Sequence, residues 1–304
     1  MSALYTSALA ASAEAASGQH YPQGTLFIVA TPIGNLADIS LRALYLLGMV
    51  DAIACEDTRH TQALLRAYGI DKSTSQLIAL HQHNETQASQ TVIDRLLTGQ
   101  RVAYVSDAGT PGISDPGARL VAAVRARSLR CIPLPGPSSV TTVLSAAGIS
   151  DDQAGGFVFA GFLSSKAAER DRMVLALAAE TRAVVLLEAP HRMEALALAL
   201  ANLGERAITV GRELTKQFEE IATVSAHDLP QWLSQDANRL RGEFALVVHP
   251  APVQGNAGQD TRILKLLLEQ LPLKTAVKLA ADITGEPRNT LYQTALDLKS
   301  ANTV

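Results

Sequence analysis

Carboxylates, small hydroxyl side chains and glycine- or proline-rich turns follow short apolar runs, and these are the residues that could do chemistry. Ser106–Gly117 (SDAGTPGISDPG) holds two aspartates, two prolines and three glycines directly after the apolar run Arg101–Val105. Glycine lets a backbone approach a ligand closely, and proline fixes the neighbouring dihedral angles. Ligands of α/β proteins bind at such strand ends. The segment therefore predicts a ligand site, with a purely structural turn as the alternative.

Three further segments of this kind follow apolar runs in the first half of the chain: Thr31–Asn35, Glu56–Thr61 and Pro135–Ser139. The second half supplies Glu188–Arg192 and Gly211–Lys216. We expect these segments to line one cleft with backbone amides, hydroxyls and carboxylates. Such a cleft suits a nucleoside-like ligand, whose ribose needs acceptors and whose base needs a flat apolar slot.

Strands and helices must alternate to bring these segments together. In the first half the apolar runs predict strands at 26–30, 51–55, 76–80, 101–105 and 130–134, with helices at 38–47, 61–68, 86–97 and 118–127 between them. This alternation predicts a mostly parallel sheet covered by helices on both faces.

A second unit begins near Gly156 after a helix at 140–147. Its predicted strands are 157–161, 183–188, 207–212, 221–225 and 244–249, and its helices are 167–179, 193–203 and 227–234. Because long helices are missing between some of the last strands, we expect part of this sheet to be antiparallel. Three helices at 261–269, 273–283 and 288–299 resemble a helix-turn-helix module, with Gly285–Pro287 as the last turn.

These elements predict an α/β protein of two domains with a small helical module. The predicted parts are a disordered leader (1–24), two α/β domains (25–136 and 137–250), a linker (251–260) and the helical module (261–304). The leader has no Lys or Arg, which argues against a secretory signal. No run of eighteen apolar residues predicts a membrane span.

Composition and missing motifs exclude several classes of protein. A net charge of −3 gives no global attraction to nucleic acid, and the two cysteines lack zinc-site spacing and fit a reduced cytoplasm. P-loop, dinucleotide-binding GxGxxG, HExxH and GxSxG motifs are absent. His81, His83 and Glu85 are a weak metal pattern, for which a solvated strand end is the favoured interpretation, so we expect no metal.

Six motifs in order resemble one family: Thr31–Asn35, Cys55–Arg59, Ser106–Gly117, Pro135–Ser138, Phe159–Leu163 and Glu188–Arg192. They are similar to the tetrapyrrole methylase superfamily, and within it to the branch of small-subunit ribosomal RNA (cytidine-2′-O)-methyltransferases. The resemblance extends from Leu26 to His249, and the C-terminal helices resemble the module appended in that branch.

The resemblance implies S-adenosylmethionine bound in the cleft between two α/β domains, usually within a homodimer. It also implies cytoplasmic methylation of a ribose 2′-hydroxyl at cytidine 1402 of the 16S RNA, in the small ribosomal subunit. Carried over residue by residue, the cofactor contacts fall on Pro32, Asp107, Ala108, Thr110, Ser138, Ser139, Leu187 or Glu188, and Leu214. Asp107 stands where relatives carry an acidic residue after a glycine pair, whereas Tyr104–Ser106 precede it here.

A ribose hydroxyl is a poor nucleophile, so a general base would help methyl transfer, while no metal is demanded. The candidates are Glu56, Asp57, His60, Glu188, Glu213 and Lys216. Glu56 and Asp57 are preferred because they end a strand beside Arg59, which could hold a phosphate. Alternatively, Asp57 caps the following helix and Arg59 pairs with a surface group. Glu188 could equally anchor Arg192 without any catalytic role.

RNA binding would need local positive charge, for which Arg59, Arg192 and Lys216 are the preferred candidates. The helical module fits docking to RNA or protein, or a cap that stabilises a dimer. Two other functions remain open: a small-molecule methylase of the same superfamily acting on a tetrapyrrole-type acceptor, and a non-catalytic RNA-binding assembly factor. The appended helices argue against the first, and the intact Gly/Pro loop with Asp107 argues against the second.

Overall fold

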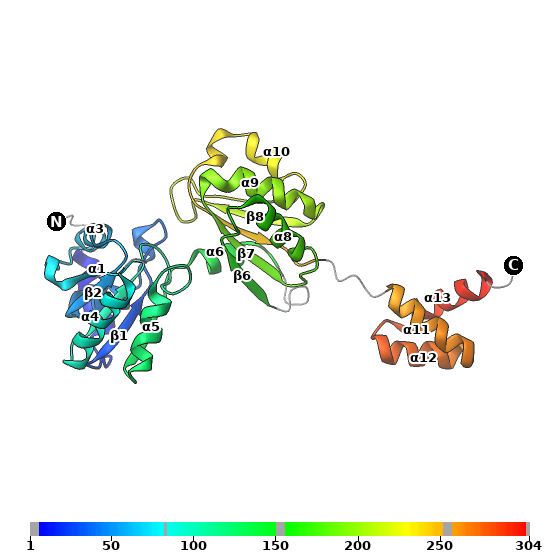
Figure 1. Ribbon diagram of the computed structural model, residues 1–304, viewed down its shortest axis with the longest axis horizontal. Coiled ribbons are helices and arrows are strands. Elements are labelled where there is room, and N and C mark those ends of the chain that lie inside the picture. The colour runs from blue at the N-terminus through cyan, green and yellow to red at the C-terminus, as the bar shows by residue number, and fades with distance from the viewer. Residues whose placement is uncertain (1–5, 82–83, 150–155, 252–256, 302–304) are drawn as a thin grey trace. The chain divides into compact units, whose positions relative to one another are not determined.

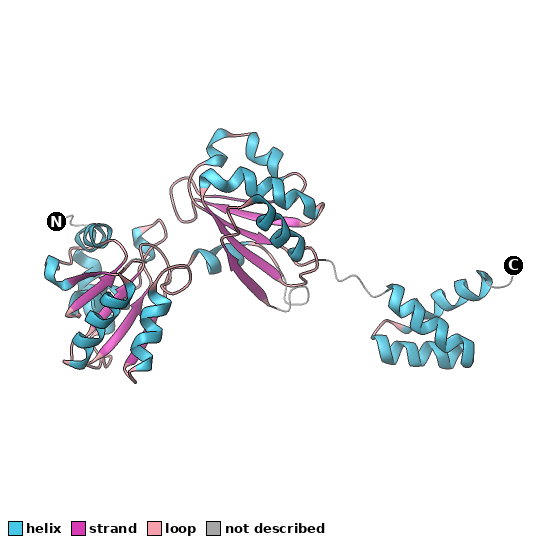
Figure 2. Cartoon of the chain, viewed as in Figure 1, coloured by secondary structure: helices cyan, strands magenta, loops and turns pink. Residues whose placement is uncertain are grey.

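The computed structural model describes residues 6–81, 84–149, 156–251 and 257–301. The chain divides into two compact units, residues 1–251 and 252–304. The larger unit contains two five-stranded sheets with their helices, and the smaller unit is entirely helical (Figures 1 and 2).

The first sheet is fully parallel, as the sequence predicts. Its strands are β1 (Thr25–Val29), β2 (Ala52–Cys55), β3 (Leu77–Ala79), β4 (Val102–Val105) and β5 (Arg130–Leu134), in the order β3-β2-β4-β1-β5. β1 lies between β4 and β5, and β4 lies between β1 and β2. The segments that follow β1, β2, β4 and β5 therefore meet at one edge of the sheet.

Helices cover both faces of this sheet, and side chains alternate between them. Phe27 and Ile53 pack on the face covered by α2 (Leu41–Met49) and α3 (Thr58–Ala67). Leu26 and Tyr104 pack on the other face, under α4 (Glu85–Leu97) and α5 (Gly117–Ala126). Burial on both faces explains why these strands are short continuous apolar runs. Short 3₁₀ turns, Leu36–Asp38 and Thr74–Gln76, precede α2 and β3.

The predicted disordered leader is wrong for residues 6–16. They form helix α1 (Thr6–Ala16), and the Leu9 side chain packs against the same core as α2. The Tyr21 hydroxyl donates a hydrogen bond to the carbonyl of Ala16, at the end of α1. Ala-rich sequence has high helix propensity, and packing against the first sheet's helical layer explains the ordered helix.

The second sheet is mixed, again as expected. Its strands are β6 (Phe157–Gly161), β7 (Ala183–Glu188), β8 (Ala207–Arg212), β9 (Glu220–Ser225) and β10 (Phe244–Val248), in the order β6-β7-β10-β8-β9. β6 and β7 are parallel, whereas β10 runs antiparallel to β7 and β8, and β9 runs antiparallel to β8.

Helix α6 (Ser139–Ala146) covers one face of the second sheet, where Val143 packs with Val185. The other face packs against α8 (Ala167–Leu177), α9 (Pro190–Leu200) and α10 (Leu229–Ser234). The 3₁₀ turns Ala201–Leu203 and Ala237–Leu240 follow α9 and α10. Because α6 directly follows the last strand of the first sheet, its N-terminus lies at the predicted site.

The smaller unit consists of α11 (Ala257–Gln270), α12 (Leu273–Thr284) and α13 (Arg288–Ala301) around a small core that includes Leu264 and Leu291. Gly285 ends α12 in the left-handed conformation, at the predicted turn. The predicted linker is wrong for residues 257–260, which belong to α11, while residues 252–256 lie outside the described residues. Within the described residues, no helix is long and apolar enough to cross a membrane.

Candidate active site

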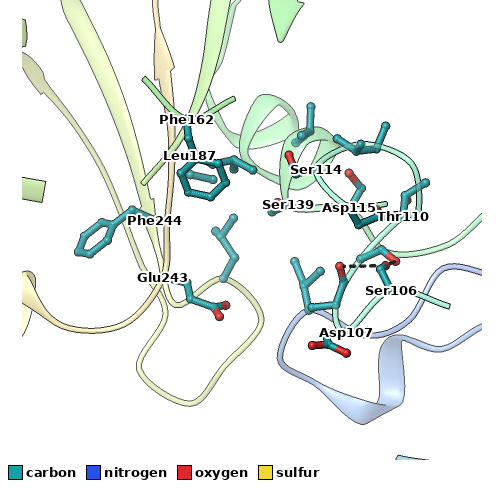
Figure 3. A pocket seen from close by; sticks show the side chains of 18 of the residues that line it. Ser106, Asp107, Thr110, Ser114, Asp115, Ser139, Phe162, Leu187, Glu243 and Phe244 are labelled. Atoms are coloured by element: carbon teal, nitrogen blue, oxygen red, sulfur yellow. Dashed lines mark hydrogen bonds between the residues drawn. The ribbon is translucent and has the colours of Figure 1, made fainter. Parts of the chain in front are cut away.

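A cavity of about 460 Å³ lies between the strand ends of the two sheets (Figure 3). Figure 3 shows Asp107, Thr110 and Asp115 on one side of it, facing Phe162 and Leu187 on the other. Eight of the predicted site residues line it: Glu56, Asp107, Ala108, Thr110, Ser138, Ser139, Glu188 and Leu214. Pro32, Asp57, Arg59, Arg192 and Lys216 are not among its lining residues.

The loop after β4 is fixed to the loop after β1 by backbone pairing. Thr31 and Gly109 form an isolated antiparallel bridge with two N–H···O bonds of 3.0 Å. The buried Thr31 hydroxyl also donates to the carbonyl of Ser106 at 3.1 Å. Gly109 has φ +81°, and a Cβ there would lie 3.3 Å from Ile33 Cγ2. The turn therefore needs glycine.

Asp115 holds the second half of the same loop in place. Its carboxylate accepts hydrogen bonds from the Tyr104 hydroxyl (2.8 Å), the Gly112 amide (2.6 Å) and the Gly117 amide (2.7 Å). A Cβ on Gly117 would lie 2.1 Å from the Tyr104 ring, so glycine is required by space. Burial and the neighbouring Asp115 carboxylate raise the pKa of Tyr104, which keeps the hydroxyl a donor.

Glu56 and Asp107 tie the ends of β2 and β4 together at the cavity. The Asp107 amide donates to Glu56 Oε1 at 3.2 Å, and the Asp57 amide donates to Asp107 Oδ1 at 3.3 Å. Burial raises the pKa of Glu56, and the carboxylates of Asp107 and Asp115 raise it further, against the effect of the Asp107 amide. A carboxylate with a raised pKa is a better proton acceptor near neutral pH.

Asp57 and Arg59 behave as the alternative interpretation predicts. Asp57 is the N-cap of α3, accepting from the amides of Arg59 (2.8 Å) and His60 (3.4 Å). Its Oδ2 also pairs with the Arg59 guanidinium at 3.1 Å, and this hydrogen bond lowers the pKa of Asp57. The Arg59 side chain is 91% exposed, so its charge remains accessible to a large ligand.

Glu188 both lines the cavity and anchors Arg192. Its Oε1 forms an ion pair with Arg192 Nε at 3.1 Å and accepts a hydrogen bond from the Ala189 amide at 2.9 Å. Arg192 also donates to the carbonyl of Leu163. Glu188 Oε2 is buried without a hydrogen-bond partner among the described residues. A buried carboxylate oxygen usually accepts a hydrogen bond, and a bound ligand that donates one would satisfy this oxygen.

The start of α6 adds hydroxyls and backbone amides to the cavity. Ser138 is the N-cap residue of α6, and Ser139 begins the helix. The first amides of a helix have no intrahelical partners, so this end suits a carboxylate or another anion. The Thr110 hydroxyl donates to the carbonyl of Pro137 at 2.9 Å, which connects the loop after β4 to the same segment.

Lys216 is engaged within the protein. Its Nζ lies 2.7 Å from Glu213 Oε1 and 3.2 Å from Glu243 Oε2. Leu214, two residues earlier, is 6% exposed and lines the cavity. The structure thus brings Leu214 to the predicted site and places the Lys216 ammonium in a pair of ion pairs beside it.

Several cavity residues were missed by reasoning from the sequence. Phe162, Glu243 and Phe244 line the cavity, and Phe162 is half exposed. Phe162 lies within the motif Phe159–Leu163, which was a usable signal. Phe244 begins β10 and Glu243 directly precedes it, and the position of β10 beside β7 depends on tertiary pairing.

No group of three or more His, Cys, Asp and Glu side chains that could hold a metal ion occurs among the described residues. Of the weak metal pattern, His83 lies outside the described residues, and Glu85 pairs with Arg119.

Comparison with protein families matches residues 25–230 to the tetrapyrrole (corrin/porphyrin) methylases and residues 254–299 to the RsmI C-terminal HTH domain. Proteins named ribosomal RNA small subunit methyltransferase I are similar over most of the chain. The one from Escherichia coli O157:H7 is 46% identical, covering 90% of this chain and 96% of its own length. The one from Pseudomonas aeruginosa PAO1 is 45% identical, with coverages of 90% and 97%.

Solved structures share the fold at low sequence identity. Uroporphyrin-III C-methyltransferase from Thermus thermophilus has a TM-score of 0.54 at 19% identity, covering 75% of this chain and 94% of that chain. Cobalt precorrin-4 methyltransferase has a TM-score of 0.55 at 16% identity, with coverages of 76% and 98%. The chain belongs to the tetrapyrrole methylase family, in the branch of the small-subunit ribosomal RNA methyltransferases I.

Proposed function

We propose that this protein transfers a methyl group from S-adenosylmethionine to the ribose 2′-hydroxyl of cytidine 1402 in the 16S RNA. The observation that carries the proposal is the convergence of eight predicted site residues, from both halves of the larger unit, on one cavity. The names of relatives at about 45% identity over 90% of the chain support the same reaction class and RNA substrate.

The residues of the cavity fit this methyl donor. Its volume of about 460 Å³ lies within the range of roughly 300–1,000 Å³ typical of cofactor pockets. Asp107 supplies an acceptor for a ribose or an ammonium group, and the first amides of α6 suit a carboxylate. Leu187, Leu214 and Phe244 supply apolar surface for a base. Asp107, Ala108, Thr110, Ser138, Ser139 and Leu214 are the residues that would hold the donor.

When bound, S-adenosylmethionine supplies an electrophilic methyl group on a sulfonium, which needs no metal for transfer. The protein must then orient the acceptor hydroxyl and remove its proton. Glu56 is the proton acceptor that we propose, with Oε2 taking the proton because Oε1 holds the Asp107 amide. Its raised pKa suits this role. Asp57 caps α3 and thereby positions the end of β2, and we assign it no role in proton transfer.

Recognition of the RNA requires positive charge outside the cavity. Arg59 is the most exposed of the three predicted phosphate contacts and lies beside the strand end that carries Glu56. The match of residues 254–299 to an HTH domain supports a docking role of the helical module on the small subunit. We also propose a homodimer acting in the cytoplasm, as the family resemblance implies.

Methyl transfer by the purified full-length protein tests this proposal. Labelled S-adenosylmethionine is supplied with assembled small subunits, with free 16S RNA and with a tetrapyrrole acceptor. We expect label in the RNA, mapped by mass spectrometry to one ribose. Label in the tetrapyrrole alone would establish the small-molecule alternative, and donor binding without transfer to any acceptor would support a non-catalytic assembly factor.

A further inference from the structure

The turn between β8 and β9 contains two residues with an unusual backbone. Glu213 has φ +52° and Thr215 has φ +66°, in the left-handed region that favours glycine. For the β-branched Thr215 this conformation is a genuine outlier. Leu214 lies between them and is buried in the cavity wall. Strained residues persist only where surrounding interactions hold them, and they cluster at ligand sites.

A network of charged groups holds this turn. Glu213 Oε1 accepts from the Glu243 amide at 3.0 Å and from Lys216 Nζ at 2.7 Å. Lys216 Nζ also pairs with Glu243 Oε2 at 3.2 Å, and the Glu213 amide donates to the Glu243 carbonyl at 2.9 Å. The Thr215 amide donates to Glu219 Oε2 at 2.5 Å. The turn is thus fixed both to the start of β10 and within itself.

Three glycines leave the space that the side chains of this turn occupy. A Cβ on Gly242 would lie 2.4 Å from Glu213 Cγ, and one on Gly211 would lie 2.9 Å from Leu214 Cδ2. A Cβ on Gly34 would lie 2.4 Å from Lys216 Cγ. The absence of a side chain at each of these glycines therefore leaves room for the side chains of Glu213, Leu214 and Lys216.

The same turn reaches the loop after β1, on the other side of the cavity. The Thr215 hydroxyl oxygen accepts a hydrogen bond from the Asn35 amide at 3.1 Å. Ile33, two residues before Asn35, lines the cavity together with Leu214. The turn is thereby connected to both walls, one belonging to each sheet.

We propose that Glu213, Thr215 and Lys216 are positioning residues that hold Leu214 and the loop after β1 in the shape that binds the methyl donor. On this proposal, which rests on the proposed function, Lys216 serves the donor site and not the RNA. Its ammonium is already neutralised by two carboxylates, whereas a phosphate contact needs an accessible cation. The affinity of a site falls in proportion to the fraction of molecules in the binding-competent conformation.

Lys216→Met separates donor binding from RNA binding. We expect the donor Kd, measured by calorimetry with S-adenosylmethionine, to rise about tenfold, as for loss of one charge-assisted hydrogen bond. We expect affinity for small subunits to stay at the wild-type value. Arg59→Ala is the matched control, for which we expect an unchanged donor Kd and weaker binding to small subunits. Weakened subunit binding by Lys216→Met with an unchanged donor Kd would overturn the proposal.

Thr215→Val and Thr215→Ser test the connection to Asn35. Valine keeps the shape and β-branching of threonine but cannot accept from the Asn35 amide, whereas serine can. We expect faster hydrogen exchange of the Asn35 amide and a higher donor Kd in the valine variant, with rescue by serine. Equal exchange and equal Kd in both variants would contradict the proposal.

The exchange measurement needs no bound donor, so it tests the turn even if the wild-type protein fails to bind S-adenosylmethionine. That failure would refute the proposed function. Accelerated exchange in Thr215→Val would then still show the positioning of the loop, and wild-type exchange would refute it.

Discussion

The carboxylates on the two walls of the cavity are stabilised by different interactions. On the wall formed by the first sheet, Glu56, Asp107 and Asp115 accept from backbone amides and a tyrosine hydroxyl. Within the described part of the chain, none of the three forms an ion pair. On the opposite wall, Glu188 pairs with Arg192, and Glu213 and Glu243 pair with Lys216.

This difference gives the two walls different roles: the first provides charged groups for the chemistry, and the second fixes the shape of the site. Amides stabilise a carboxylate without cancelling its charge, so the first wall keeps a negative field. Burial, together with this field, raises the pKa of Glu56. On the second wall the two charges of each ion pair neutralise each other, and the pair fixes the positions of both side chains. We therefore expect changes on the first wall to alter affinity and pH dependence directly. Changes on the second wall should alter stability, and should alter affinity only through the geometry of the site.

Glu56→Gln has the largest expected effect. We expect kcat to fall at least about a hundredfold, the typical contribution of a general base. The donor Kd should change little, because glutamine retains the carbonyl that accepts the Asp107 amide. Single-turnover kinetics with small subunits measures the loss; a kcat near the wild-type value would remove Glu56 from the mechanism.

The pH dependence sharpens the same assignment. The base must be ionised, so activity should fall as the pH drops through the raised pKa of Glu56. Asp107→Asn removes a neighbouring negative charge, which should move this acidic limb to lower pH. Because folding raises the pKa of Glu56, its ionisation destabilises the fold as the pH rises through the unfolded and folded pKa values. Glu56→Gln should accordingly raise Tm at neutral pH.

Arg192→Met tests the second wall. It leaves Glu188, whose side chain is 1% exposed, without its cation, so we expect the free energy of unfolding to fall by about 2 kcal/mol. This figure allows for the partial exposure of Arg192. Adding Glu188→Gln should restore part of the loss. Arg182→Met breaks a pair between more exposed side chains and should change the free energy of unfolding much less. Equal losses in denaturant titrations would contradict the contrast between the two sites.

Asp107→Ala should weaken donor binding by about tenfold to a hundredfold, the range for removing a charged acceptor. Calorimetry with S-adenosylmethionine measures the change. Asp107→Asn keeps the acceptor for the Asp57 amide and isolates the effect of charge. An unchanged Kd in both variants would place the donor away from the first wall.

Arg59→Ala should have the smallest effect. Its pair with Asp57 is exposed, so we expect Tm to stay within the error of the measurement. Affinity for the small subunit should fall a few-fold, and the slope of log affinity against log salt should decrease by about one. An unchanged slope would exclude a phosphate contact at Arg59.

The first wall could be predicted from the sequence because its residues follow strands that are buried on both faces. Such strands are short apolar runs, and β4 was placed within one residue of its observed start at Val102. The strands of the second α/β unit could be predicted equally well, and the predicted bounds of β7 and β8 agree with the observed ones.

The second wall was harder because its arrangement depends on pairing between distant segments. Nothing near Glu213 or Thr215 indicates a left-handed backbone, since neither residue type favours it. The ion pair of Lys216 with Glu243 arises only when β10 lies beside β8. Helix α1 was missed because its composition resembles a linker, and its order depends on packing that involves Leu9.

Mass spectrometry of the ribosomal RNA from a host strain that lacks this protein tests the central claim most directly. We expect the fragment containing cytidine 1402 to lose one ribose methyl group. Wild-type protein should restore the methyl group, and Glu56→Gln should restore little or none. A fragment that keeps its ribose methyl in the deletion strain would contradict the proposed function.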